Sequence, residues 1–93
     1  MEKVRVEFSI EANESFQALR KGPPLIAQLA LRYYNELFEI PPERWGRIRR
    51  ENHWDTFVSE KHCVFDIRGV IEEAQPVRIL NITHFELRKT SQK

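Results

Sequence analysis

Hydrophobic and polar residues first alternate along the chain and then change to a helical period. Val4, Val6 and Phe8 alternate with charged residues, which predicts a strand with one buried face. Ser9 is a good helix N-cap, and apolar residues recur after it at helical spacing. We therefore expect a strand up to residue 8 and a short amphipathic helix over Ile10–Arg20.

A second and wider apolar stripe follows a Gly-Pro-Pro break. It predicts a helix over about Pro24–Glu39, which the prolines at 41 and 42 end. Two amphipathic helices in succession need an apolar surface to cover, which indicates a helical layer on a sheet. The charged segment Glu43–Asn52 is expected to form a short helical turn followed by a loop.

The second half of the chain is rich in strand-forming residues. His53–Val58 and His62–Ile67 predict an antiparallel hairpin, because only three polar residues separate them. Gly69 either ends the second strand or marks a bulge. A polar turn is expected over residues 72–76, ended by a proline. The nearly continuous β-branched run Val77–Thr83 is typical of a central strand that is covered on both faces.

The predicted order is β-α-α-β-β-β, in one domain spanning residues 1–93. Helices that are grouped in the sequence, followed by grouped strands, indicate an α+β fold with the helices on one sheet face. The polar tail 89–93 is expected to fray. Fifteen basic residues against fourteen acidic ones argue against a strongly basic nucleic-acid coat, but they leave room for a local basic patch.

Cysteine and histidine usage limits the chemistry further. The single cysteine, Cys63, excludes an internal disulfide, and no cysteine spacing indicates zinc. The three histidines lack the spacing of a metal motif, so neither a metal nor another cofactor is expected. A charged N-terminus and short apolar runs indicate neither a signal peptide nor a membrane span, and a cytoplasmic location is the simplest interpretation.

The first candidate site is a run of arginines beside tryptophans. Such residues can contact phosphates and stack on unpaired bases. The alternative is a solvated turn, with the arginines paired to Glu43 and Glu51 and the tryptophans anchoring the turn to the core. The candidate RNA-binding residues are Arg44, Arg47, Arg49, Arg50 and Trp54.

The second candidate is His84, just beyond a predicted strand. A histidine at a strand end can act as a general acid or base near neutral pH. Arg78 lies six residues earlier and, by period two, shares the same strand face. The alternative is a rim histidine without chemistry. His62 opens the second hairpin strand, where a histidine is usually structural.

Four segments together resemble the RelE/ParE superfamily of bacterial toxin–antitoxin toxins. The likeness covers about Val4–Arg88 and depends on the order and spacing of the segments. The opening segment is similar to the family's first strand and acidic helix start. The apolar helix, the hairpin and the closing strand that ends in histidine follow in the family's order. The segments are VEFSIEANESF, Leu25 to Phe38, HWDTFVSEKHCVFDI and PVRILNITH.

The resemblance implies a twisted antiparallel sheet with two helices packed on one face, and a toxin neutralised by a cognate antitoxin. Some members cut messenger RNA on the ribosome without a metal, whereas others poison DNA gyrase. In the cutting members the RNA 2′-hydroxyl attacks the adjacent phosphate, which needs a base, cations and an acid. His84 matches the closing histidine. Arg78 and Arg88 are cations near it in sequence, and His62 completes the set of candidate catalytic residues.

The chain departs from the family pattern at two positions. Cys63 and Phe57 stand where members often have basic residues. The first hypothesis is a ribosome-dependent ribonuclease toxin that uses His84. The departures favour a second hypothesis, a gyrase poison or a non-catalytic member that only binds its antitoxin. An unrelated small α+β binding domain is the third.

Overall fold

The chain forms a mixed α+β fold, as predicted. The computed structural model describes residues 3–74 and 77–90. Within that part of the chain there are three α-helices, one 3₁₀ turn and a five-stranded sheet. The helices are α1 (Ile10–Arg20), α2 (Pro24–Glu39) and α3 (Pro42–Trp45), and the 3₁₀ turn is η1 (Arg50–Asn52). The strands are β1 (Lys3–Phe8), β2 (Arg47–Ile48), β3 (His53–Glu60), β4 (Cys63–Ala74) and β5 (Val77–Thr90).

The sheet has the strand order β1-β5-β4-β3-β2. β2, β3, β4 and β5 are antiparallel in succession, but β1 runs parallel to β5, with Lys3 opposite Val77. The prediction of a wholly antiparallel sheet is therefore wrong. A short hairpin turn forces two strands to pair antiparallel. Both long helices and the hairpin lie between β1 and β5 in the sequence, so no short turn fixes the relative direction of these two strands.

Both long helices begin and end as predicted. The Ser9 hydroxyl accepts a hydrogen bond from the backbone N–H of Ala12 at 3.1 Å, which caps α1. Pro24 opens α2, where the missing N–H of a proline costs nothing. The buried faces of α1 and α2 pack with one side of β3, β4 and β5. This core comprises Ala12, Phe16, Leu29, Ala30, Tyr33, Leu37, Trp54, Cys63, Phe65, Ile67, Ile71, Leu80, Ile82 and Phe85.

The predicted hairpin is confirmed, but its strands are longer than expected. β4 continues past Gly69 to Ala74, so residues 72–74, which were expected in a turn, belong to the strand; Gln75 and Pro76 lie outside the described residues. Likewise β5 extends to Thr90, into the tail that was expected to fray, whose residues 91–93 lie outside the described range. β2 was missed altogether, because two residues are too few to show a period.

Two bulges interrupt the pairing of β5 with β4. Arg68 is opposite His84 but Gly69 is opposite Ile82, so Thr83 is an extra residue in β5; Arg88 is a second one. An extra residue reverses the alternation of side chains. The prediction that Arg78 and His84 share a strand face is therefore wrong.

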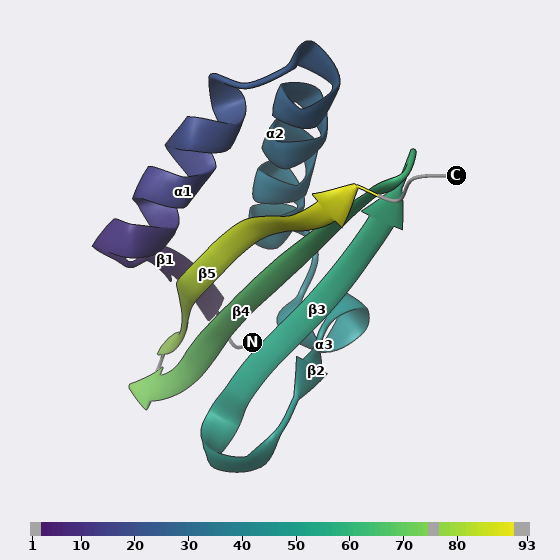
Figure 1. The fold of residues 1–93 in the computed structure, drawn as a ribbon. Coiled ribbons are helices and arrows are strands. Elements are labelled where there is room, and N and C mark those ends of the chain that lie inside the picture. Colours follow the sequence, from purple (N-terminus) through teal and green to yellow (C-terminus); the bar gives the residue numbers. More distant parts are fainter. Residues whose placement is uncertain (1–2, 75–76, 91–93) are drawn as a thin grey trace.

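Within residues 3–74 and 77–90, one face of the sheet carries no helix. Figure 1 shows α1 and α2 together behind β3, β4 and β5, with the nearer side of these strands uncovered. Ile79 and Asn81 on β5 are accordingly only partly buried, so the expectation of a strand covered on both faces is wrong. We call this uncovered side the open face. Among the described residues, no helix combines the length and apolar character needed to cross a membrane.

Candidate functional site on the open face

Strand alternation determines which side chains reach the open face. On β4, Cys63, Phe65 and Ile67 are buried against the helices. Asp66 and Arg68 alternate with them and therefore point to the other side of the sheet.

His84 lies on the open face directly across from Arg68. The two residues are paired in the β4–β5 register, and the His84 side chain is exposed. Its Nδ1 lies 3.0 Å from the Thr83 hydroxyl oxygen, and that hydroxyl donates its proton to the backbone carbonyl of Arg68 at 3.4 Å. Glu86 follows two residues later and lies on the same face, opposite Asp66. Thus the bulged residue Thr83 links the imidazole to the neighbouring strand.

Arg68 is held in place by Asp66. Its Nε and Nη2 donate to the two carboxylate oxygens of Asp66 at 3.0 and 2.9 Å. The hydrogen bond and the charge of Asp66 raise the pKa of Arg68, so the guanidinium stays cationic. The arginine side chain is still 51% exposed, whereas that of Asp66 is 8% exposed. We call Asp66, Arg68, His84 and Glu86 the His84 cluster.

Arg88 and Phe57 meet beside this cluster. The guanidinium carbon of Arg88, on β5, lies 5.2 Å from the centroid of the Phe57 ring, on β3. Because β4 separates these strands, the contact spans it, next to the position of Asp66. The pair is a cation–π contact, which such a distance allows.

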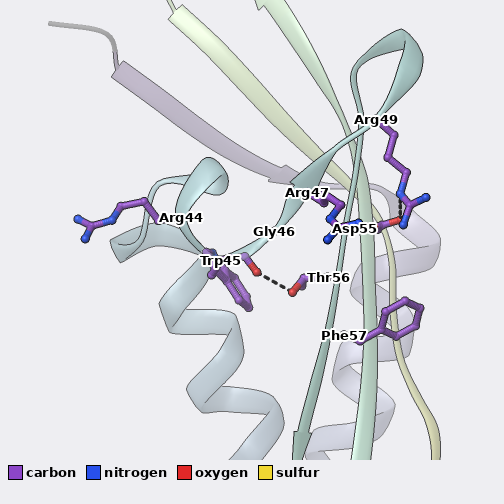
Figure 2. A pocket seen from close by; sticks show the side chains of 8 residues that line it. All are labelled: Arg44, Trp45, Gly46, Arg47, Arg49, Asp55, Thr56 and Phe57. Carbon is purple, nitrogen blue, oxygen red and sulfur yellow. Dashed lines mark hydrogen bonds and ion pairs between the residues drawn. The ribbon is translucent and has the colours of Figure 1, made fainter.

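A groove of about 490 Å³ borders β3 on its other side. It is lined by Arg44, Trp45, Gly46, Arg47, Arg49, Asp55, Thr56 and Phe57. Figure 2 shows Arg47 and Arg49 near Asp55, and the Nε of Arg49 is 2.9 Å from its carboxylate. Arg44 points away from these arginines (Figure 2). The groove therefore offers a basic wall formed mainly by β2 and the segment after it.

The candidate RNA-binding residues do not form one surface. Arg47 and Arg49 line the groove, whereas Arg50 is exposed in η1 and does not line it. Trp54 is only 1% exposed, and its indole N–H donates to the carbonyl of Pro42 at 3.0 Å. A ring buried in this way has no face on which a base could stack. For Trp54, the geometry supports the alternative, in which the tryptophan anchors the turn to the core.

Arg78 is directed to the helix-covered side of the sheet. Its guanidinium forms an ion pair with Glu43 of α3 and lies 3.6 Å from a carboxylate oxygen of Glu73; its side chain is 17% exposed. A backbone hydrogen bond within Glu43, and then the one from Arg78, lower the pKa of Glu43. Arg78 thus joins α3 to the sheet, on the face opposite His84.

His62 also lies apart from His84. It occupies the β3–β4 turn, where Lys61 and His62 have φ of 52° and 69°. Arg68 is six residues further along the chain, a distance of roughly 20 Å in a strand. Of the four candidate catalytic residues, the structure brings His84 and Arg88 to one region and leaves Arg78 and His62 elsewhere.

Sequence reasoning missed Arg68, Asp66, Glu86 and the exposed ring of Phe57. The signal for the first two is the alternation in CVFDIR, because a buried Cys63 places Asp66 and Arg68 on the opposite face. Phe57 follows in the same way from alternation with Trp54 on the hairpin strand, whereas Glu86 needed the pairing register and the bulge positions, which no local pattern reports. Comparison of the chain with models of protein families, with curated proteins and with solved structures found no match.

Proposed function

We propose that this chain is a toxin of the RelE/ParE type that cuts messenger RNA on the ribosome without a metal and is neutralised by a cognate antitoxin. The order of its elements supports the proposal, as do the two helices on one sheet face and the closing strand that carries His84. All three follow the pattern that the resemblance implies.

The observation that carries the proposal is the His84 cluster. His84 and Glu86 are two residues apart on one strand, about 7 Å between their Cα atoms, and Arg68 lies opposite them. One of the two titratable groups would take the proton of the 2′-hydroxyl. The other would protonate the leaving oxygen, while Arg68 stabilises the charge on the phosphorane. Cleavage then leaves a cyclic phosphate and a free 5′-hydroxyl.

The two departures from the family pattern do not remove arginine from the open face. Cys63 is 3% exposed and packs in the core, so a charge at that position would be buried. Arg68 comes from the same strand but reaches the open face, and Arg88 places its guanidinium over Phe57. Two arginines thus lie on the open face, with Arg68 paired to Asp66 and Arg88 placed over Phe57, which favours the catalytic hypothesis over the antitoxin-binding one.

A purified translation system with a defined message tests this function. We expect the wild-type protein to cut the message in the presence of ribosomes, with cut sites located by primer extension. His84→Gln should slow cutting by roughly 10²- to 10⁴-fold, the usual contribution of a general acid or base. The matched control is His53→Gln, which changes an exposed histidine outside the cluster and should leave the rate unchanged.

Other outcomes would reject parts of the proposal. Unchanged cutting by His84→Gln would remove His84 from the site. If the message stays intact and induction in bacteria instead raises DNA-damage signalling, a gyrase poison replaces the ribonuclease. If neither response occurs, a binding-only protein remains. A neighbouring reading frame for a small protein with a DNA-binding start and an amphipathic tail would supply the antitoxin.

A further inference from the structure

Phe57 is an aromatic side chain on the open face that lies outside the hydrophobic core. It is 49% exposed, whereas Trp54 on the same strand is 1% exposed. Odd and even positions of β3 face opposite sides, so the strand buries its tryptophan and presents its phenylalanine. An exposed ring of this size, away from the core, is available for contact with a partner.

The ring lies between two basic regions. Arg88 approaches it across β4, from the β5 side, with its guanidinium carbon 5.2 Å from the ring centroid. On its β2 side, Phe57 is part of the lining of the groove that contains Arg47 and Arg49. Strand order therefore places the ring between the Arg88 contact and the groove.

The charge beside the ring is only partly neutralised. Arg49 is paired with Asp55 at 2.9 Å. Within the part of the chain that the structure describes, neither Arg47 nor Arg88 forms an ion pair with a carboxylate. We call Arg47, Phe57 and Arg88 the basic–aromatic strip. It extends over the strands from β2 to β5, roughly 14 Å at the usual spacing between strands.

We propose that this strip binds single-stranded RNA, with an unpaired base stacked on Phe57 and the flanking phosphates held by Arg47 and Arg88. A free single strand combines phosphate charge with flat base surfaces, and the strip offers a partner for each. An acidic peptide would need only the arginines. The inference rests on the proposed function, because it supplies the substrate contact beside the His84 cluster.

A short RNA hexanucleotide containing 2-aminopurine tests the strip directly, with the full chain at low salt. Stacking should quench the fluorescence of the base when the wild-type protein binds. Phe57→Leu should abolish the quenching and weaken binding roughly 5- to 100-fold, as expected for one stacked base. Phe57→Tyr should retain both. The matched control is Phe38→Leu, which changes a 53% exposed ring on α2 and should have no effect.

Salt dependence separates the ring from the arginines. The slope of log affinity against log salt concentration measures how many counterions the RNA releases on binding. Phe57→Leu should leave this slope unchanged, whereas Arg47→Gln should lower the number of released counterions by about one. No binding by the wild-type protein, equal binding by Phe57→Leu, or quenching that persists in that variant would overturn the proposal. So would an acidic hexapeptide that competes fully with the RNA on both the wild type and Phe57→Leu.

The failures of the two proposals are distinguishable. If the RNA stacks on Phe57 but no message is cut, the strip stands and the ribonuclease proposal falls. If His84→Gln abolishes cutting while Phe57→Leu leaves both RNA binding and KM unchanged, the ribonuclease proposal stands and the strip proposal falls.

Discussion

The close approach of Gly46 to Trp54 makes a sharp test of how the β2 segment is attached to the core. A Cβ atom added at Gly46 would lie 2.1 Å from Cε2 of the Trp54 ring, far inside van der Waals contact. Gly46 has φ of −135°, which any residue can adopt, so backbone strain does not contribute. We therefore expect Gly46→Ala to be strongly destabilising because of the ring alone.

The size of the effect follows from what must move. The ring and the added methyl group must separate by about 1.5 Å to reach ordinary contact, and overpacking of this kind costs about 1–3 kcal/mol. Moving the Trp54 ring also disturbs its 3.0 Å hydrogen bond to Pro42 and its edge contact with Trp45, at 5.6 Å between centroids. These add about 1–2 kcal/mol. The total, about 2–5 kcal/mol, is a large part of the roughly 5–14 kcal/mol expected for a domain of this length.

Urea unfolding followed by tryptophan fluorescence and circular dichroism would measure the loss, which corresponds to a fall in Tm of roughly 10–30 °C. The matched control is Gly22→Ala, at which the nearest atom to an added Cβ is the Leu19 carbonyl oxygen at 3.4 Å. That change should be neutral or stabilise by up to about 1 kcal/mol, because alanine restricts the unfolded chain.

A double variant distinguishes the ring contact from a general effect at Gly46. Trp54→Phe removes the indole atoms that the methyl group would meet, so Gly46→Ala should cost less in that background than in the wild type. Strictly additive losses would refute the reasoning, as would a Gly46→Ala protein as stable as the wild type.

Two further predictions concern the turn and the pH dependence of stability. His62→Gly should stabilise the fold by about 0.5–1 kcal/mol in urea unfolding, because glycine adopts φ of 69° without strain; a loss of stability would show that the imidazole makes a contact that matters more. Burial and the 2.7 Å hydrogen bond to Glu60 raise the pKa of Tyr33, so the folded state holds this proton more tightly. The contribution of Tyr33 to the free energy of unfolding should be constant below about pH 10 and fall as pH rises further. Tyr33→Phe should remove this fall. The pKa of Glu60 is lowered by the Tyr33 hydroxyl and by Arg32, so its contribution should be present above about pH 4.3 and be lost as pH falls below that. A pH scan of urea midpoints checks both limbs, and a flat alkaline limb in the wild type would contradict the assignment to Tyr33.

The sequence predicted the elements whose signals are local. α1 and α2 follow from their apolar stripes, the Ser9 cap and the proline breaks, and the hairpin follows from two strand patterns with a short polar link. β2 gives no local signal, because its two residues are defined only by pairing with Trp54 and Asp55. The parallel direction of β1 likewise depends on a partner at the far end of the chain.

The candidate site was harder to predict, because a β-bulge leaves no periodic pattern of apolar and polar residues in the sequence. Counting in twos from Arg78 places His84 on the same face, and the extra residue Thr83 reverses that result. Position in the sequence therefore grouped His84 with an arginine on the other side of the sheet. The residue opposite His84 on the neighbouring strand is Arg68. Alternation along that strand from the buried Cys63 would have placed Arg68 on the open face.

The parallel pairing of β1 with β5 also constrains the order in which the protein can assemble during synthesis. Lys3 pairs with Val77, 74 residues further along the chain, and β5 contributes Leu80, Ile82 and Phe85 to the core. Until β5 leaves the ribosome, β1 has no partner strand and the apolar faces of α1 and α2 lack much of their cover. Such dependence on distant contacts is associated with slow folding and with exposed surface along the way. A nascent chain stopped before Val77 should therefore remain sensitive to protease, and resistance should come only once β5 has emerged.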